Sequence, residues 1–195
     1  MEDYGAGLDG KATQYLGRVR TEAQRMGRLI DGLLRLSRIV RGDMTIRQVD
    51  LSALANRVAG RLVEANPDRR IEFVIEPGLA AIGDAGMLDI ALTNLFDNAV
   101  KFTGKREVAV ISFGRSNEPD GARFFVRDNG AGFDMEFAGL LFGAFQRLHS
   151  QAEFPGTGIG LATVQRVVRR HGGNIRASSE PDKGAMFSFV LERSS

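Results

Sequence analysis

The sequence predicts an α+β fold, a two-layer sandwich in which a mixed, mostly antiparallel sheet carries helices on one face, preceded by a long helix. Three observations predict it. Apolar residues follow heptad spacing over residues 13–41, and this spacing ends at Gly42-Asp43. Segments of helical periodicity then alternate with segments of strand-like alternation, and the last of them have the pattern of a β-hairpin. We therefore expect two domains, residues 1–43 and residues 44–195.

Residues 13–41 are the clearest helical segment of the chain. Apolar positions recur at alternating spacings of three and four for more than three heptads. Further leucines widen the apolar stripe beyond the seam of a two-stranded coiled coil, which favours a four-helix bundle. We expect a homodimer through residues 13–41, and the alternative is that this helix packs onto its own globular domain. The seam consists of Leu16, Val19, Ala23, Met26, Ile30, Leu33, Ser37 and Val40.

The second part of the chain alternates helices and strands. Asp50 is a suitable N-cap for a helix that runs towards Ala65. A second helix is expected over residues 86–102, and a third over residues 161–171 with Gly172-Gly173 as its C-cap. Strands are expected over residues 71–75, 108–113, 123–126, 175–178 and 185–191, of which the last two form the hairpin.

Composition and charge exclude several classes of function. The 195 residues contain no cysteine, which excludes disulfides, thiolate zinc sites and a cysteine nucleophile. The net charge is only +2, from 26 basic and 24 acidic residues, which argues against nucleic acid as a partner. No apolar run approaches the roughly 20 residues of a membrane span, and the acidic N-terminus does not resemble a signal peptide. We therefore expect a soluble, cytoplasmic protein with no membrane segment in this chain.

The helix expected over residues 86–102 carries an unusual polar face. Asn94, Asn98 and Lys101 are spaced i, i+4 and i+7, so they share one side of the helix, whereas the other side is apolar. Asparagine is a middling helix former that buries no apolar surface, so two on one face suggest a function. An amide oxygen is a hard ligand for Mg²⁺, and a lysine supplies a point charge for phosphate. The alternative is a solvated face that is rich in asparagine.

The strand expected over residues 123–126 leads into Asp128-Asn-Gly-Ala-Gly-Phe133. A carboxylate at the end of a strand can accept a hydrogen bond from an exocyclic amine such as N6 of adenine. Gly130 and Gly132 would let the backbone approach a flat ligand closely. The alternative is a plain turn, because Asp-Asn-Gly is strong turn chemistry.

A third segment, Gly156-Thr-Gly-Ile-Gly-Leu161, opens the helix expected over residues 161–171. Its backbone amides can line up at the N-terminus of that helix, where the helix dipole favours anions. The glycine spacing differs from that of a dinucleotide-binding fold, and the P-loop lysine pattern is absent. The signatures of serine/threonine protein kinases are also missing. The segment therefore predicts an anion site outside those three classes.

Together with Phe142-Gly-Ala-Phe145, these segments stand in an order similar to that of the ATP-binding catalytic domain of sensor histidine kinases. The N-box of that family corresponds to residues 94–102, the first G-box to 128–133, the F-box to 142–145 and the second G-box to 156–161. The resemblance covers residues 44–195 and extends to the superfamily that includes gyrase, the mismatch-repair ATPases and the heat-shock chaperone ATPases. Residues 165–173 further resemble the phytochrome-like branch of these kinases.

The resemblance implies ATP or ADP and Mg²⁺ as cofactors, and it assigns roles to matching residues. Asn98 would bind Mg²⁺, Lys101 would contact phosphate and Asp128 would hold adenine. A lid would run from about residue 133 to residue 155, and Arg147 would reach the γ-phosphate from it. Gyrase-type relatives carry a hydrolytic glutamate where this chain has Asn94, which favours phosphoryl transfer over steady hydrolysis.

The implied site residues come from all four motifs. One departure is Ala185, where many relatives carry a hydroxyl residue facing the adenine site, and it would weaken nucleotide binding. The implied catalytic residues are Asn94, Asn98, Lys101 and Arg147. The implied nucleotide-binding residues are Asn94, Asn98, Lys101, Phe102, Asp128, Gly130, Gly132, Phe145, Gly156, Thr157, Gly158, Gly160 and Leu161.

The phosphoacceptor of the resembled family is missing. Residues 11–43 resemble the second helix of its dimerisation and phosphotransfer domain, and residues 2–4, before a flexible turn, resemble the end of the first helix. The phosphorylated histidine lies upstream on that first helix, and His149 and His171 are poor substitutes for it. We therefore expect the chain to bind Mg-ATP or ADP without autophosphorylating. Its partners would be a phosphoacceptor histidine helix missing here and a response regulator downstream.

Two other functions remain open from the sequence. One is a stand-alone protein kinase of the anti-sigma-factor type, although those proteins lack the heptad helix. The other is a non-catalytic dimeric adaptor whose pocket senses ATP and ADP. Adding the missing first helix as a separate chain distinguishes kinase from adaptor, because only a kinase would phosphorylate it.

Overall fold

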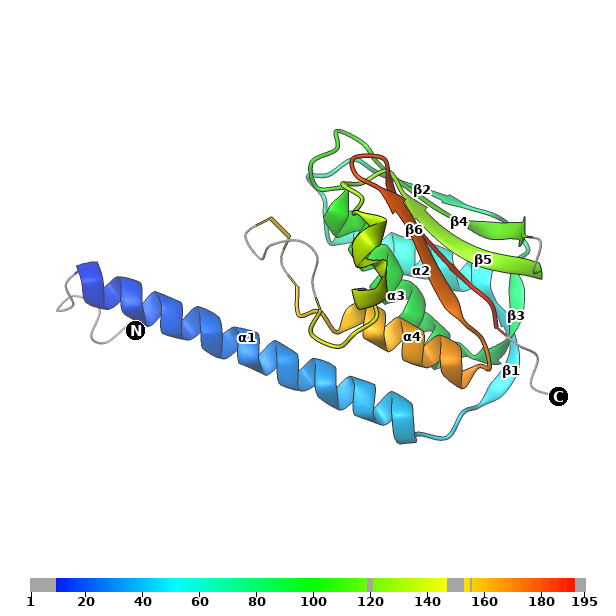
Figure 1. Ribbon diagram of the computed structural model, residues 1–195, viewed down its shortest axis with the longest axis horizontal. Helices are drawn as coiled ribbons and strands as arrows, with labels where there is room; N and C mark the ends of the chain where they lie inside the picture. Colours follow the sequence, from blue (N-terminus) through cyan, green and yellow to red (C-terminus); the bar gives the residue numbers. More distant parts are fainter. Residues whose placement is uncertain (1–9, 119–120, 147–152, 155, 192–195) are drawn as a thin grey trace.

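The computed structural model describes residues 10–118, 121–146, 153–154 and 156–191. A sheet carries helices on one face, and a long helix precedes this body (Figure 1). The α+β class with helices on one face of the sheet is therefore confirmed. The helices are α1 (Gly10–Arg41), α2 (Leu51–Glu64), α3 (Ala85–Phe102) and α4 (Gly160–Arg170), with a 3-10 helix at Met135–Leu140. The strands are β1 (Ile46–Asp50), β2 (Ile71–Ile75), β3 (Ala80–Asp84), β4 (Ala109–Glu118), β5 (Gly121–Asp128), β6 (Ile175–Glu180) and β7 (Gly184–Phe189).

Five strands form the main sheet in the order β2-β4-β5-β7-β6. β2 and β4 are parallel, and the other three pairs are antiparallel, so the sheet is mixed and mostly antiparallel as predicted. β4 and β5 are longer than the sequence indicated. Their ladder continues beyond the apolar alternation, through pairs that include polar residues of β4, such as Ser116 with Arg123 and Asn117 with Ala122. β6 and β7 form the expected terminal hairpin.

The hydrophobic core lies between the main sheet and helices α2, α3 and α4. Phe96 of α3 is fully buried, and its ring centroid lies 5.1 Å from that of Phe73 in β2 and 6.1 Å from that of Phe113 in β4. Such aromatic pairs add about 1 kcal/mol each beyond the burial of their area. The apolar face predicted for α3 is buried, and this packing fixes the position of the opposite, polar face of the helix. That apolar face consists of Leu88, Leu92, Leu95 and Ala99, each at most 2% exposed.

β1 and β3 form a separate antiparallel pair that the sequence did not reveal. Only Val49 of β1 is buried, so this segment lacks the alternation that marks a half-buried strand. The pair places an aspartate at the start of two helices. Asp50 accepts a hydrogen bond from Ala53 N in α2 at 2.8 Å, as predicted, and Asp84 accepts one from Met87 N in α3 at 2.9 Å. Both helix N-termini are thereby anchored on the same small sheet.

α4 ends at the predicted glycine pair, with Gly172 at a φ of 74°. His171, at the end of this helix, is only 2% exposed. Its Nε2 accepts a hydrogen bond from Asp84 N at 2.9 Å, so Nδ1 carries the proton and donates to Val167 O at 2.8 Å. His171 is thus a buried link between the end of α4 and the end of β3.

α1 is the long helix in Figure 1, and it contacts the body along α4. Gly32 lies against Ile159, the residue before α4, so closely that a side chain at Gly32 would displace the isoleucine. None of the described helices is long and apolar enough to cross a membrane. Residues 1–9 lie outside the described residues, and the homodimer through residues 13–41 stays a prediction. Exposed apolar side chains of α1 include Leu16, Val19, Met26, Ile30 and Leu33, at 41–65%.

Candidate functional site

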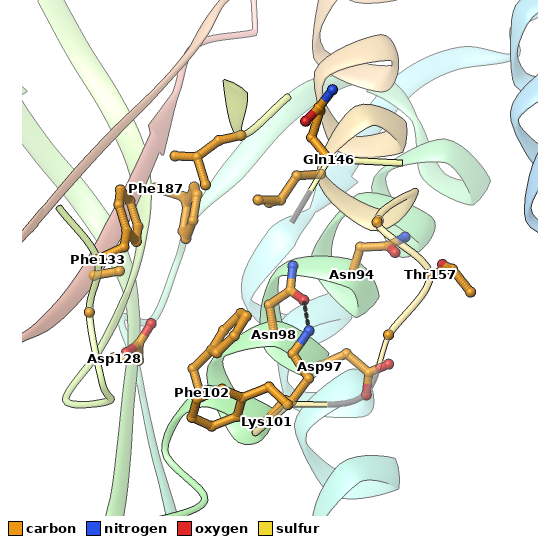
Figure 2. A pocket seen from close by; sticks show the side chains of 18 residues that line it. Asn94, Asp97, Asn98, Lys101, Phe102, Asp128, Phe133, Gln146, Thr157 and Phe187 are labelled. Carbon is orange, nitrogen blue, oxygen red and sulfur yellow. Dashed lines mark hydrogen bonds between the residues drawn. The ribbon is translucent and has the colours of Figure 1, made fainter. Parts of the chain in front are cut away.

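A cavity of about 240 Å³ lies between α3 on one side and the ends of β5 and β7 on the other. The loop before α4 closes it along a third edge. Figure 2 shows Asp128, Phe133 and Phe187 on one side of the cavity and Asn98, Lys101 and Phe102 on the other. The lining residues are Asn94, Asp97, Asn98, Lys101, Phe102, Asp128, Gly132, Phe133, Leu141, Gln146, Phe154, Gly156, Thr157, Gly158, Gly160, Leu161, Ala185 and Phe187.

The polar face of α3 forms one wall of the cavity. Asn98 Oδ1 accepts a hydrogen bond from Lys101 Nζ at 3.1 Å, shown as the dashed line in Figure 2. The same Nζ lies 4.2 Å from the ring centroid of Phe102. Asn94 Nδ2 donates to Ile90 O at 2.8 Å, which fixes the orientation of that amide. This wall therefore presents a cation, amide oxygens and the Asp97 carboxylate to whatever the cavity holds.

Asp128, at the end of β5, supplies the carboxylate of the opposite wall. It is only 6% exposed, and its Oδ1 accepts a hydrogen bond from Gly130 N at 2.8 Å. Burial raises the pKa of Asp128 to about 6, although hydrogen bonds from the Gly130 and Ala185 amides partly offset that effect. A buried carboxylate this poorly solvated gains from a ligand that donates a hydrogen bond to it.

The loop after Asp128 needs glycine for two reasons. Gly132 has a φ of 61°, in the left-handed region. A Cβ at Gly132 would overlap the carbonyl of Glu180, and a Cβ at Gly130 would lie 2.7 Å from Phe102 O. The loop is thus pressed between the end of α3 and the β6–β7 turn. Gly130 does not line the cavity and packs against the end of α3, whereas Gly132 lines the cavity itself.

The loop of residues 156–160 brings the N-terminus of α4 to the cavity. Gly158 has a φ of 75°, and Phe145 N donates to its carbonyl at 2.9 Å. No side chain caps the first turn of α4. A Cβ at Gly160 would lie 2.9 Å from Asn94 Oδ1, so the glycine lets α4 approach α3 closely. An anion placed here would meet the positive end of the α4 dipole.

Aromatic side chains line the cavity near Asp128. The Phe102 and Phe154 rings meet edge to face with centroids 5.0 Å apart, and Phe133 and Phe187 lie 6.3 Å apart across from them. Ala185 is 8% exposed and lies on the same strand face as Phe187. The strand alternation of residues 185–191 could have indicated Phe187, whereas Phe154 carries no pattern that points to the site.

The cavity gathers most of the residues that the motifs predicted. Ala185, which the resemblance placed facing the adenine site, also lines it, whereas six other lining residues were not predicted. Three predicted residues are not placed in the cavity. Gly130 lies behind its wall, the side chain of Phe145 is 54% exposed and reaches the site only through its backbone, and Arg147 lies outside the described residues, as does His149. The residues not predicted are Asp97, Phe133, Leu141, Gln146, Phe154 and Phe187.

The cavity is therefore polarised from end to end. One end has an almost fully buried carboxylate among aromatic rings, which suits a flat base with an exocyclic amine. The other end has Lys101, two asparagine amides and a helix N-terminus, which suit phosphates and their counter-ion. A nucleoside polyphosphate combines these two chemistries in one molecule.

Comparison with known proteins agrees with this geometry. Residues 83–195 match the family described as histidine kinase-, DNA gyrase B-, and HSP90-like ATPase. The chain is 32% identical to cyanobacterial phytochrome B of Nostoc sp., over 98% of this chain and 26% of that protein. It is 33% identical to the sensor histidine kinase ZraS of Klebsiella oxytoca, over 94% of this chain and 39% of that protein. The chain thus spans only part of the length of the relatives that it matches.

Two solved structures share the fold. The mycobacterial sensor histidine kinase MprB aligns with a TM-score of 0.61 and 28% identity, over 75% of this chain and 97% of that one. Full-length ShkA in complex with AMPPNP aligns with a TM-score of 0.69 and 26% identity, over 95% of this chain and 40% of that one. The chain therefore belongs to the family of histidine kinase-, DNA gyrase B- and HSP90-like ATPases, and within it to the catalytic domains of the sensor histidine kinase type.

Proposed function

We propose that this chain binds Mg-ATP and presents the γ-phosphate for transfer to a histidine on a phosphotransfer helix. The observation that carries the proposal is the polarity of a single cavity, with Asp128 at one end and Asn98 and Lys101 at the other. ShkA, a structural relative over 95% of this chain, was solved with AMPPNP, which supports ATP as the ligand. Asp128 would accept the hydrogen bond of the adenine amine, and the second G-box would hold the phosphates.

The residues present fit a magnesium ion that is bound mainly through phosphate. Among the described residues, no group of three histidine, cysteine or acidic side chains could hold a metal alone. Mg²⁺ commonly takes one or two protein oxygens beside substrate phosphates and water. Asn98 Oδ1 already faces the Lys101 ammonium at 3.1 Å, so this oxygen points to where a cation can sit. In the proposed complex Asn98 would bind Mg²⁺ and Lys101 would contact a phosphate oxygen.

Phosphoryl transfer to the histidine would need no covalent intermediate on this domain. The acceptor imidazole nitrogen would attack the γ-phosphorus in line, the bond to the β,γ-bridging oxygen would break, and ADP would leave. Positioning and charge neutralisation then supply most of the catalysis. The side chain of Asn94 is an amide, which cannot act as a general base. Because a general base would activate water, its absence at this position favours phosphoryl transfer over hydrolysis. Arg147 remains our proposed contact to the γ-phosphate from the lid.

The histidine is proposed to come from outside these 195 residues. His171 is buried, and both of its ring nitrogens are engaged in hydrogen bonds to the backbone, so neither can attack a phosphate. His149 lies outside the described residues. A homodimer through residues 13–41 belongs to the same proposal, supported by the exposed apolar side chains of α1, and sedimentation equilibrium would test it.

The magnesium assignment is tested by Asn98→Ala. We expect the affinity for ATP in the presence of Mg²⁺ to fall roughly 10–100-fold, as for the loss of one charge-assisted ligand, and affinity in EDTA to change little. Calorimetric titration with and without Mg²⁺ measures both. Asn56→Ala is the control for truncating a helical asparagine, because Asn56 lies on α2 outside the cavity, where its Nδ2 donates to Ser52 O at 2.8 Å. Unchanged Mg²⁺ dependence in Asn98→Ala would remove Asn98 from the metal site.

Phosphoryl transfer is tested with γ-labelled ATP and the phosphotransfer helix of a relative supplied as a separate chain. We expect acid-labile label on the added helix and none on this chain. Label that passes on to a response regulator would complete the proposed sequence. Binding of ATP without labelling of the helix would favour the nucleotide-sensing adaptor instead. Acid-labile label on this chain alone would contradict the proposal that its own histidines do not accept phosphate.

A further inference from the structure

Arg106 follows α3 by four residues and ties three segments of the chain together. Its Nε donates to Asn129 O at 2.7 Å, and its Nη2 donates to Gly130 O at 3.0 Å and to Asp182 O at 2.5 Å. Its backbone N–H donates to Thr103 O at 2.9 Å, which fixes the residue to the end of α3. One side chain thus joins the end of α3, the loop after β5 and the turn between β6 and β7.

These three segments form the wall behind the carboxylate end of the cavity. Ala131 N donates to Phe102 O at 3.0 Å, and Asp182 N donates to Ala131 O at 2.7 Å. The same loop carries Asp128 and Gly132, which line the cavity. Arg106 itself is not among the lining residues, and its side chain is 35% exposed. Any effect of Arg106 on a ligand must therefore pass through this loop.

We propose that Arg106 is a positioning residue for recognition of the nucleotide base. It holds residues 128–132 in the geometry that presents the Asp128 carboxylate to the exocyclic amine of adenine. Gly130 links the two groups directly, because its N–H donates to Asp128 Oδ1 at 2.8 Å while its carbonyl accepts from Arg106. This inference rests on the proposed function, which supplies the nucleotide.

The shape of the guanidinium, more than its charge, performs this role. A planar fork donates to several carbonyls at fixed angles, which a lysine ammonium does not reproduce. Asp182 Oδ1 lies 3.9 Å from Arg106 Nη2, but the aspartate side chain is 92% exposed, so this ion pair contributes little. Without the guanidinium, the carbonyls of Asn129, Gly130 and Asp182 would lose the donor that joins them, while the backbone hydrogen bonds of Ala131 and the side-chain hydrogen bonds of Asn129 would remain.

Arg69 provides a matched control at the same helix end. Its guanidinium donates to Val100 O at 2.6 Å and to Thr103 O at 3.0 Å, so it also secures the C-terminus of α3. Neither bond involves residues 128–132 or the β6–β7 turn. Arg69→Ala should therefore destabilise the fold without loosening the loop that carries Asp128.

The first test compares ATP with GTP, which has a carbonyl where adenine has its amine. Calorimetric titration measures the affinity for ATP divided by the affinity for GTP. This ratio should fall about tenfold in both Arg106→Lys and Arg106→Ala. Binding of inorganic tripolyphosphate should stay unchanged, because the phosphate end is not touched. Arg69→Ala should keep the wild-type preference even where its Tm falls. A preference unchanged in both Arg106 variants, or lost equally in Arg69→Ala, would overturn the inference.

A second measurement needs no nucleotide, so it separates failure of this inference from failure of the proposed function. Hydrogen exchange of the nucleotide-free protein reports on the amides of Gly130, Ala131 and Asp182. We expect these amides to exchange about tenfold faster in Arg106→Lys and at the wild-type rate in Arg69→Ala. Wild-type protein that binds no nucleotide would refute the proposed function. Unchanged exchange at the three amides would refute the role of Arg106 itself.

Discussion

Asp128→Asn is expected to weaken ATP binding roughly 100-fold, because the cavity would lose its acceptor for the adenine amine. The amide oxygen would take the place of Oδ1, which accepts from Gly130 N, and the amide NH₂ would then face the base as a donor. Two donors facing each other in a buried site are strongly unfavourable. Calorimetric titration at pH 7.5 measures the effect, and binding within threefold of wild type would contradict the assignment of Asp128.

Asp134→Asn is the matched control for this substitution. Asp134 lies in the same segment, but it is exposed, and its Oδ1 accepts from Glu136 N at the start of the 3-10 helix. It does not line the cavity. The control should therefore bind ATP like the wild type, and a comparable loss there would mean that the segment, and not the Asp128 carboxylate, determines affinity.

The same carboxylate gives ATP binding a dependence on pH. Its pKa is raised to about 6 in the nucleotide-free protein, and the ionised form is the better acceptor for the adenine amine. Protons therefore compete with adenine below pH 6, and wild-type affinity should fall as the pH is lowered from 7 to 5. Asp128→Asn should not show this part of the fall. The titration of the nucleotide's own phosphates is common to both proteins and cancels in their ratio.

Asp128→Asn should also stabilise the nucleotide-free fold at neutral pH. The pKa of Asp128 is about 6 in the folded protein and 3.8 for an ordinary aspartate, so folding favours the protonated carboxyl. The stability that this group contributes is fully present below pH 3.8 and is lost as the pH rises through 6. Two pKa units correspond to about 3 kcal/mol, an upper limit for the gain at pH 7.5 because the amide opposes Ala185 N. Urea unfolding at pH 4 and pH 7.5 measures the free energy of unfolding, and the gain should appear only at the higher pH.

Helical periodicity was enough to predict the α3 wall of the cavity. Spacing alone placed Asn94, Asn98 and Lys101 on one face, because side chains at i, i+4 and i+7 of any α-helix share a side. Asp128 was predictable since a strand pattern ends beside it. Arg106 was not, because its role depends on three carbonyls that only the folded chain brings together.

The strands that the sequence did not indicate lack a clear alternation of apolar and polar residues. β1 buries one side chain, Val49, and β3 consists largely of small residues, so neither shows a period of two. The sequence did not indicate that His171 links α4 to β3, because its partner, Asp84 N, lies 87 residues earlier in the chain. Phe145 belongs to a motif, yet its side chain is 54% exposed and does not line the cavity, and its φ is 66°. Long-range pairing and backbone conformation decided these four cases.

Gly184→Ala is expected to destabilise the fold by roughly 3–5 kcal/mol and to disable the base site together with it. Gly184 has a φ of 89°, and a Cβ there would overlap the carbonyl oxygen of Asp128 and lie 3.0 Å from Asn129 Cα. Both neighbours are backbone atoms, at the end of β5 and at the start of the loop that follows it, so no side-chain rotation relieves the overlap. The turn would have to move away from Asp128, and the amide of Ala185 would move with it.

Gly78→Ala separates backbone strain from this overlap. Gly78 has a φ of 75°, and a Cβ there would meet nothing within 4 Å. It should therefore lose only about 1 kcal/mol, the strain of a left-handed alanine. Urea unfolding of the two variants, with ATP titration of whatever remains folded, gives the comparison. If both variants lost the same free energy of unfolding, left-handed strain alone would account for both losses. The contact between the β6–β7 turn and the Asp128 backbone would then not be what stabilises the base site.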